Sequence, residues 1–383
     1  MSRIALRFLT NDERIKEIGL RYWELDNKNN FVSSVASIAK DYNIKTSDIN
    51  RNNSLFLEVF SVCEFCLSCN APYKFKDRND FKKHNGLLSE WVCDECVKKQ
   101  RLFVDSEKIN ILKTIQEMVF RNCFFLEDLN FKDAIFLLSL VRYSINEDFL
   151  FLLPESKNYN KFLSPNYEYT IKIYKYLKSK NIINISPLSN LDFITNDPLK
   201  NQFSYCITEV IWDVVINYEI YPTLKCFIEI LEDKISDRNK WNESWFIESR
   251  ILCKEVLLQE LLSYLIYILS EHKLEFSPGE KTEFVLAKIL DKYSVAQGYN
   301  LIWSSAKDAA AYYMRGGISK QQAANSVVGR IEAKLERYMI NDWELKSFGR
   351  NYNLPTSILS QILFGLAFKS DDGGFYKKLE QLI

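Results

Sequence analysis

The chain has 383 residues, of which 47% are hydrophobic and 26% are charged, and its formal net charge at pH 7 is zero. This length predicts two or three domains with apolar cores of their own. The balanced charge excludes a basic field over the whole protein, so any contact with nucleic acid or an acidic membrane must come from local patches.

Helix-breaking residues are scarce: the chain has 11 Gly and 8 Pro, against 26 Phe and 21 Tyr. This composition favours a mainly α, multi-domain protein. The first residues contain no apolar signal region, and the most apolar later stretch, 257–269, includes Gln259 and Glu260. It is shorter than the ~20 apolar residues that span a bilayer. We therefore expect a cytoplasmic protein with reduced cysteines and no membrane contact.

Residues 1–60 are predicted to form a small helical unit. Ile38 and Ala39 lie on one face of a helix, Asn43 suits a left-handed turn, and Ile49 would pack back from a second helix. The pattern resembles the helix-turn-helix of bacterial regulators, in which the second helix reaches base edges and phosphates. The side chains placed for that contact are Lys45, Ser47, Asn50 and Arg51. The alternative is a helical core that docks on another protein surface.

Residues 61–104 contain two Cys-x-x-Cys pairs, Cys66/Cys69 and Cys93/Cys96. This spacing is typical of a zinc ribbon, in which two small loops offer four thiolates to one structural Zn²⁺. Cys63 and Cys66 have the same spacing, so Cys63 is an alternate ligand. We favour Cys66 with Cys69 because strands are predicted after Cys69 and before Cys93.

Two further interpretations of the cysteine segment stay open. His84 lies between the two pairs and could replace a thiolate as a ligand. A redox dithiol or an iron–sulfur centre has related spacing. A closed four-cysteine zinc site has no free coordination position, so this zinc would stabilise the fold and take no part in catalysis.

The segment 73–83 carries five basic and two acidic residues among three aromatic ones. Basic groups between aromatic rings suit phosphate contact combined with base stacking. The candidate contacts are Lys74, Lys76, Arg78, Lys82 and Lys83. The alternative is that the aromatic rings form the small core of the ribbon while the basic groups are merely solvated.

The rest of the chain is predicted to be mainly helical. Residues 105–275 form a middle domain, in which a helix followed by a β-branched segment suggests a winged-helix element at 167–195. Residues 276–383 form a helical C-terminal domain, with a capping box at Ser319–Gln322.

The order of a helix-turn-helix, a zinc ribbon and a long helical region resembles bacterial proteins from mobile-element and phage-defence neighbourhoods. The chain has 2 His and no phosphate-binding glycine loop, so the sequence favours binding over catalysis. We expect a nucleic-acid-binding protein of a regulatory or antiviral defence system. The alternatives are a protein-interaction subunit of a bacterial defence or toxin complex, and a nuclease-like enzyme whose acidic site only the fold would assemble.

Overall fold

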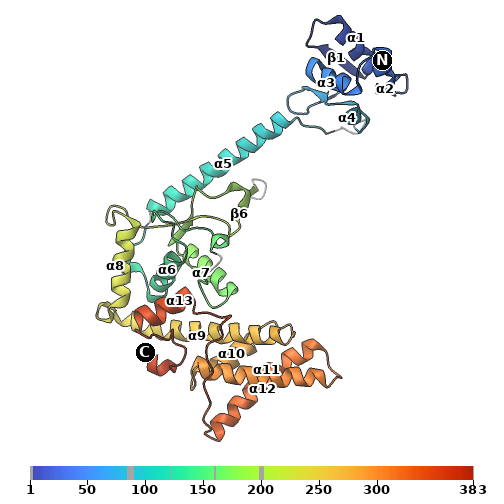
Figure 1. Ribbon diagram of the computed structural model, residues 1–383. Helices are drawn as coiled ribbons and strands as arrows, with labels where there is room; N and C mark the ends of the chain where they lie inside the picture. Colours follow the sequence, from blue (N-terminus) through green and yellow to red (C-terminus); the bar gives the residue numbers. More distant parts are fainter. Residues whose placement is uncertain (1–2, 84–89, 122, 159–160, 198–201, 383) are drawn as a thin grey trace. The chain divides into compact units, whose positions relative to one another are not determined.

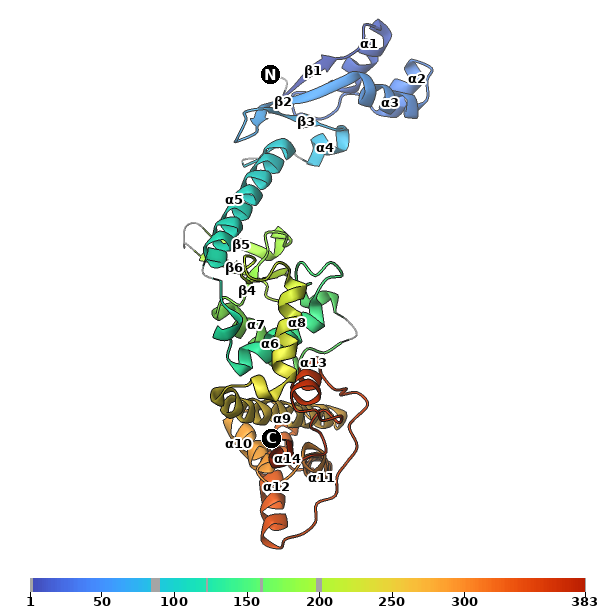
Figure 2. The ribbon, with the colours of Figure 1, turned by 90° about the vertical axis from the view of Figure 1, so that its left-hand side faces the viewer.

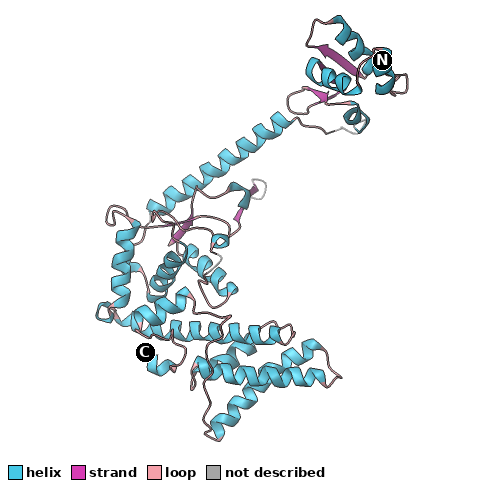
Figure 3. Ribbon diagram, in the orientation of Figure 1, coloured by secondary structure: helices cyan, strands magenta, loops and turns pink. Residues whose placement is uncertain are grey.

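The computed structural model describes residues 3–83, 90–121, 123–158, 161–197 and 202–382 (Figure 1). The chain divides into two compact units, residues 1–107 and 108–383. Helices dominate, and the largest sheet among the described residues has three strands and lies near the N-terminus (Figure 3). This confirms the mainly α fold class with a large helical C-terminal region.

The first unit is built on a three-stranded antiparallel sheet (Figure 2). β2 (Leu57–Phe65) pairs along one edge with β1 (Ile4–Phe8) and along the other with β3 (Pro72–Phe75). β2 therefore crosses the domain boundary expected at residues 60 and 61. The sheet thus joins the segment 1–60 to the cysteine segment, because β2 is hydrogen-bonded to β1 along one edge and to β3 along the other.

Short helices cover this sheet, and two of them form the expected helix-turn-helix. The helices are α1 (Glu13–Tyr22), α2 (Val35–Asp41), α3 (Thr46–Phe56) and α4 (Arg78–Lys83). Ser34 begins α2 by accepting a hydrogen bond from the Ser37 amide, and Asn43 makes the turn with a left-handed φ of 50°. Ile38 and Ile49 are fully buried where the two helices meet.

Aromatic rings from the segment 73–83 belong to the core of this unit. Phe81 packs edge-on against Phe75 and Phe31, with ring centroids 5.2 and 5.5 Å apart. Phe75 and Phe81 are 6% and 4% exposed, so neither offers a ring face to a base. Phe75 and Phe81 therefore contribute to the core of this unit, as the alternative interpretation expects for the aromatic rings of the segment.

The second unit is helical around one long apolar helix. α9 (Glu243–Glu271) packs against α6 (Phe131–Ser144), α10 (Glu280–Leu290) and α11 (Val295–Met314). In Figure 1, α6 lies on one side of α9, and α10 and α11 lie on the other. The remaining helices are α7 (Tyr167–Ser179), α8 (Leu224–Ser236), α12 (Lys320–Ile340), α13 (Ile358–Ser360) and α14 (Leu379–Leu382). Single 3₁₀ turns cover Leu126–Asp128, Glu155–Lys157, Leu191–Phe193 and Arg238–Lys240, and a π-helical turn covers Gln361–Ala367.

One continuous core fills this unit, from Leu112 to Leu382. The expected middle and C-terminal domains thus share their buried side chains, because α9 presents apolar residues around its whole circumference. The capping box at α12 forms as predicted: the Ser319 hydroxyl accepts from the Gln322 amide, and the Gln322 side chain accepts from the Ser319 amide.

The second unit also contains two small antiparallel sheets. β4 (Ile183–Ile185) pairs with β7 (Trp212–Val214), and β5 (Ile194–Asp197) pairs with β6 (Gln202–Tyr205). The segment 167–195 therefore contains the helix and strand of the expected winged element, but β4 finds its partner beyond that segment. Among the described residues, no helix combines the length and the apolar character needed to cross a membrane.

α5 (Asp94–Arg121) begins in the first unit and ends in the second. Its N-terminal turn contributes to the cysteine cluster, and its last turns line a cavity of the second unit.

Candidate metal centre and polar groove

The first cysteine pair sits in the tight connection between β2 and β3. The Cys66 amide donates to the Ala71 carbonyl at 2.8 Å, and the Asn70 amide donates to the Cys66 carbonyl at 2.9 Å. Asn70 has a left-handed φ of 58°, which an asparagine tolerates better than most residues. The turn therefore closes on itself and points both thiols of the pair to one side.

The second pair lies at the N-terminus of α5, and the strand expected before Cys93 is not formed. The Leu67 amide donates to the Trp91 carbonyl at 3.0 Å, which ties the first pair to this approach. The helix begins at Asp94, so Cys93 is the residue directly before it and Cys96 lies in its first turn. Helical spacing places residues three apart on one face, which is why Cys-x-x-Cys works here as well as in a hairpin loop.

The structure brings Cys66, Cys69, Cys93 and Cys96 together, with all four sulfurs within 4.8 Å of one another. The Sγ atoms of Cys69 and Cys93 are 3.6 Å apart. Tetrahedral coordination with metal–sulfur bonds of about 2.3 Å separates neighbouring sulfurs by about 3.8 Å. The four thiols thus have the spacing that a single tetrahedral metal ion requires.

The protonation of the cluster also suits a cation. The Cys93 amide donates to the Cys66 sulfur at 3.3 Å, and this bond, with others from backbone amides, lowers the pKa of Cys66 to about 6. Hydrogen bonds from its thiol to Cys69 and Cys93 raise the pKa of Cys96 to about 12. Four thiolates this close repel one another, so joint ionisation needs a bound dication.

Cys63 is exposed and lies outside the converging group, so the choice of Cys69 over the alternate Cys63 is confirmed. The physical reason is the register of the hairpin: Cys63 still belongs to β2, while Cys66 and Cys69 flank the turn. His84 lies outside the described residues. Among the described residues, no other group of three or more His, Cys, Asp or Glu side chains converges in this way.

The candidate contact residues of α3 are all exposed. Ser47, Asn50 and Ser54 follow one another at helical spacing, so they form one stripe along α3. Lys45 and Arg51 flank this stripe. The Tyr22 hydroxyl donates to the Asn50 side chain at 3.2 Å, which fixes the orientation of that amide.

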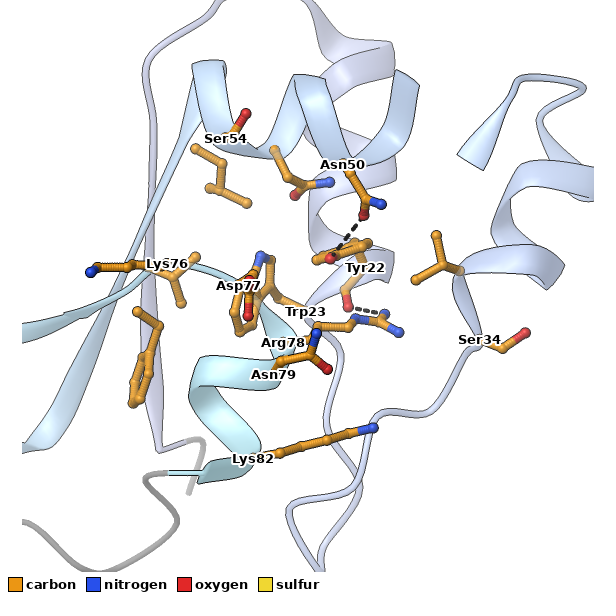
Figure 4. Close-up of a pocket in the computed structure, with 15 residues that line it drawn as sticks. Tyr22, Trp23, Ser34, Asn50, Ser54, Lys76, Asp77, Arg78, Asn79 and Lys82 are labelled. Carbon is orange, nitrogen blue, oxygen red and sulfur yellow. Dashed lines mark hydrogen bonds between the residues drawn. The ribbon is translucent and has the colours of Figure 1, made fainter. Parts of the chain in front are cut away.

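A polar groove of about 580 Å³ lies between α3 and α4 (Figure 4). Most of its polar lining comes from two segments that are far apart in the sequence. One side carries Asn50, Asn53 and Ser54, and the other carries Lys76, Asp77, Arg78, Asn79 and Lys82, with Ser34 at α2. The two contact segments expected from the sequence therefore meet at one groove. Ser54 lies just beyond the expected contact segment of α3 and was missed, although it stands one helical turn beyond Asn50.

The charge of the groove is positive, with three cationic side chains and one carboxylate. That carboxylate, Asp77, begins α4 by accepting a hydrogen bond from the Asp80 amide at 2.8 Å. Of the remaining candidates, Lys74 and Lys83 are exposed but do not line the groove. Lys74 is paired with Glu58 at 2.7 Å, and this ion pair lowers the pKa of Glu58.

Arg78 departs from the expectation of an exposed phosphate contact, because it is only 9% exposed. Its guanidinium lies 4.1 Å from the ring centroid of Tyr22 and 4.3 Å from that of Phe31. It donates to the backbone carbonyls of Tyr22 and Ser33, and its Nε has no hydrogen-bond partner. Arg78 therefore connects α1, the loop before α2 and α4, while its charge remains without a carboxylate partner among the described residues.

Comparison with protein-family models, with curated proteins and with solved structures found no match for this chain.

Proposed function

We propose that the first unit binds double-stranded DNA, with the exposed stripe of α3 facing the bases and the polar groove holding backbone phosphates. The observation that carries this proposal is the convergence of two separate polar segments on one positively charged groove. A helix-turn-helix places the N-terminal residues of its second helix against base edges. Ser47, Asn50 and Arg51 have the side chains for that contact.

The phosphate contacts are assigned to Lys76 and Lys82, which are exposed at the groove. Arg78 contributes in another way. Its buried charge has no neutralising carboxylate among the described residues, so it raises the positive potential of the groove floor. Asn50, Asn53 and Asn79 add amide groups that donate to phosphate oxygens or bases.

We also propose that the metal of the four-cysteine site is Zn²⁺ and that its role is structural. Four thiolates in tetrahedral spacing match Zn²⁺ well. The hydrogen bond from the Cys93 backbone N–H to the Cys66 sulfur adds a contact to one of the ligands from outside the site. The ion would join the β2–β3 turn to the start of α5. The groove depends on this brace because β3 leads directly into α4.

The test is a salt titration of duplex binding by fluorescence anisotropy, with the full chain and the double variant Lys76→Ala/Lys82→Ala. For each lysine–phosphate interaction that the variant removes, the slope of log affinity against log salt should decrease by about 0.9, and affinity should fall at least tenfold. The matched control is Lys98→Ala/Lys99→Ala, which removes two exposed lysines of α5 that do not line the groove. Duplex binding that is absent, indifferent to salt, or weakened equally by the control would refute the assignment.

A further inference from the structure

The second unit contains a cavity of about 570 Å³ that the proposed function does not use. The last turns of α5, the β4–β7 sheet and the loop at Leu150 surround it. Its volume falls within the range of about 300–1,000 Å³ that is usual for small-molecule sites. Most of its wall is apolar, and a few polar groups face into it.

One wall is a single face of α5. Lys113, Glu117 and Phe120 follow one another at helical spacing, and Gln116 lies beside them. Phe120 stacks on Tyr218 with ring centroids 6.1 Å apart and planes 15° from parallel. Both rings line the cavity, and Tyr218 is 50% exposed.

A carboxylate that lies against this face of α5, Asp213, stands in the middle of β7. Side chains alternate along a strand, so Trp212 and Val214 enter the core while Asp213 faces the cavity. The Gln116 side-chain amide donates to Asp213 Oδ2 at 2.8 Å. In the part of the chain that the structure describes, Asp213 has no ion-pair partner. Burial raises its pKa to about 6, against the opposing effect of hydrogen bonds from Ser186 and Gln116.

We infer that this cavity binds a planar guanine-type base, which stacks on the exposed ring of Tyr218 beside Phe120 and presents its N–H edge to Asp213. A carboxylate has about four lone-pair sites, so the hydrogen bonds from Gln116 and Ser186 leave it acceptor capacity. Guanine carries a ring N–H next to an amino group, which matches two parallel bonds to a carboxylate. Stacking on aromatic rings combined with hydrogen bonds to the base edge is how proteins hold an unpaired base.

The base could come from a free nucleotide or from a nucleic-acid strand, because the recognised edge is the same. The site lies wholly in the second unit, so it stands independently of the groove of the first unit. Failure of duplex binding would leave this inference untouched, and its own failure would leave the groove assignment untouched.

Isothermal titration of the full chain with guanosine monophosphate tests the inference. We expect saturable binding, at least tenfold weaker binding of inosine monophosphate, which lacks the amino group, and no binding of adenosine monophosphate. Asp213→Asn should weaken guanosine monophosphate at least tenfold. Asp371→Asn, an exposed carboxylate of the same unit, should leave it unchanged. Tyr218→Ala gives a second, surface-accessible variant that should also weaken binding if Asp213→Asn fails to fold.

A second arm compares a nine-nucleotide thymidine strand with the same strand carrying one central dG. If the protein prefers the dG strand and Asp213→Asn loses this preference, the base can come from a nucleic-acid strand. If the protein binds guanosine monophosphate but shows no preference for the dG strand, the base comes from a free nucleotide. No saturable binding of either probe overturns the inference. Binding that is equal in wild type, Asp213→Asn and Tyr218→Ala does so as well.

Discussion

The sulfur atoms of Cys69 and Cys93 lie 3.6 Å apart although the residues are 24 positions apart in the chain. One belongs to the turn between two strands and the other directly precedes a helix. A metal ion held between them would therefore close a long loop and join two types of secondary structure. Such a bridge would tie the β2–β3 turn to the start of α5.

Replacing a ligand should remove the metal and unfold part of the first unit. We expect Cys93→Ser to abolish stoichiometric Zn²⁺ in elemental analysis and to eliminate the metal-dependent thermal transition, because metal binding supplies folding free energy. Cys63→Ser is the matched control: this exposed cysteine lies outside the cluster, so the variant should keep one Zn²⁺ and change stability by less than about 0.5 kcal/mol. Equal metal loss in both variants would mean that the ligand set is misassigned.

Arg78 should matter for stability more than any exposed lysine nearby. Arg78→Ala removes two hydrogen bonds to carbonyls and the packing against two rings, so we expect a loss of about 2–4 kcal/mol in urea unfolding. Arg78→Lys should recover only part of this, because an ammonium cannot bridge and stack like a planar guanidinium.

The control for Arg78 is Lys83→Ala at the end of α4, which is exposed and should change stability by less than about 0.5 kcal/mol. If Arg78→Ala were equally harmless, the buried position of the guanidinium would not describe the protein in solution.

Asp213 should make the second unit less stable as the pH rises. Its pKa is raised from the ordinary 3.8 to about 6, chiefly by burial, so between these values the folded chain binds more protons than the unfolded chain. The free energy of unfolding therefore falls as the pH rises through this window, and the full penalty applies above it. A shift of about two pH units corresponds to about 3 kcal/mol.

Asp213→Asn should remove that penalty. We expect the variant to be more stable than wild type by about 2–3 kcal/mol at pH 7.5 and nearly equal to it at pH 4, measured by denaturant unfolding at both pH values. Asp371→Asn, on the surface, should show no such dependence. A stability difference that is the same at both pH values would contradict the raised pKa.

Two glycines within long helices should respond to alanine with opposite signs. A Cβ at Gly298 in α11 would lie 2.6 Å from Leu261 Cδ2 of α9, so Gly298→Ala should force these packed helices apart and cost about 1–3 kcal/mol. Gly329 in α12 has open space around it, and Gly329→Ala should stabilise the chain by about 0.5–1 kcal/mol through helix propensity. Thermal unfolding of the two variants checks both signs, and stabilisation by Gly298→Ala would show that α9 and α11 are not in close contact.

Much of the fold was predictable because its signals are local. The helical spacing of Ile38, Ala39 and Ile49, with Asn43 between the helices, specifies the helix-turn-helix from neighbours within one or two turns. The capping box at Ser319 is a bond between residues three apart. The two Cys-x-x-Cys pairs likewise carry their metal-binding potential in the spacing of each pair.

The sequence alone thus determined the mainly α class, the helix-turn-helix and the existence of a four-cysteine site. Tertiary structure decided that Cys66 pairs with Cys69 and not with Cys63, and that Cys93 stands at the start of a helix. It also decided that Arg78 is buried while Lys76 and Lys82 stay exposed. It also placed Asp213 opposite α5. These outcomes depend on strand register and on packing between residues far apart in the chain, where many pairings satisfy the same local pattern and only burial and hydrogen bonding select one.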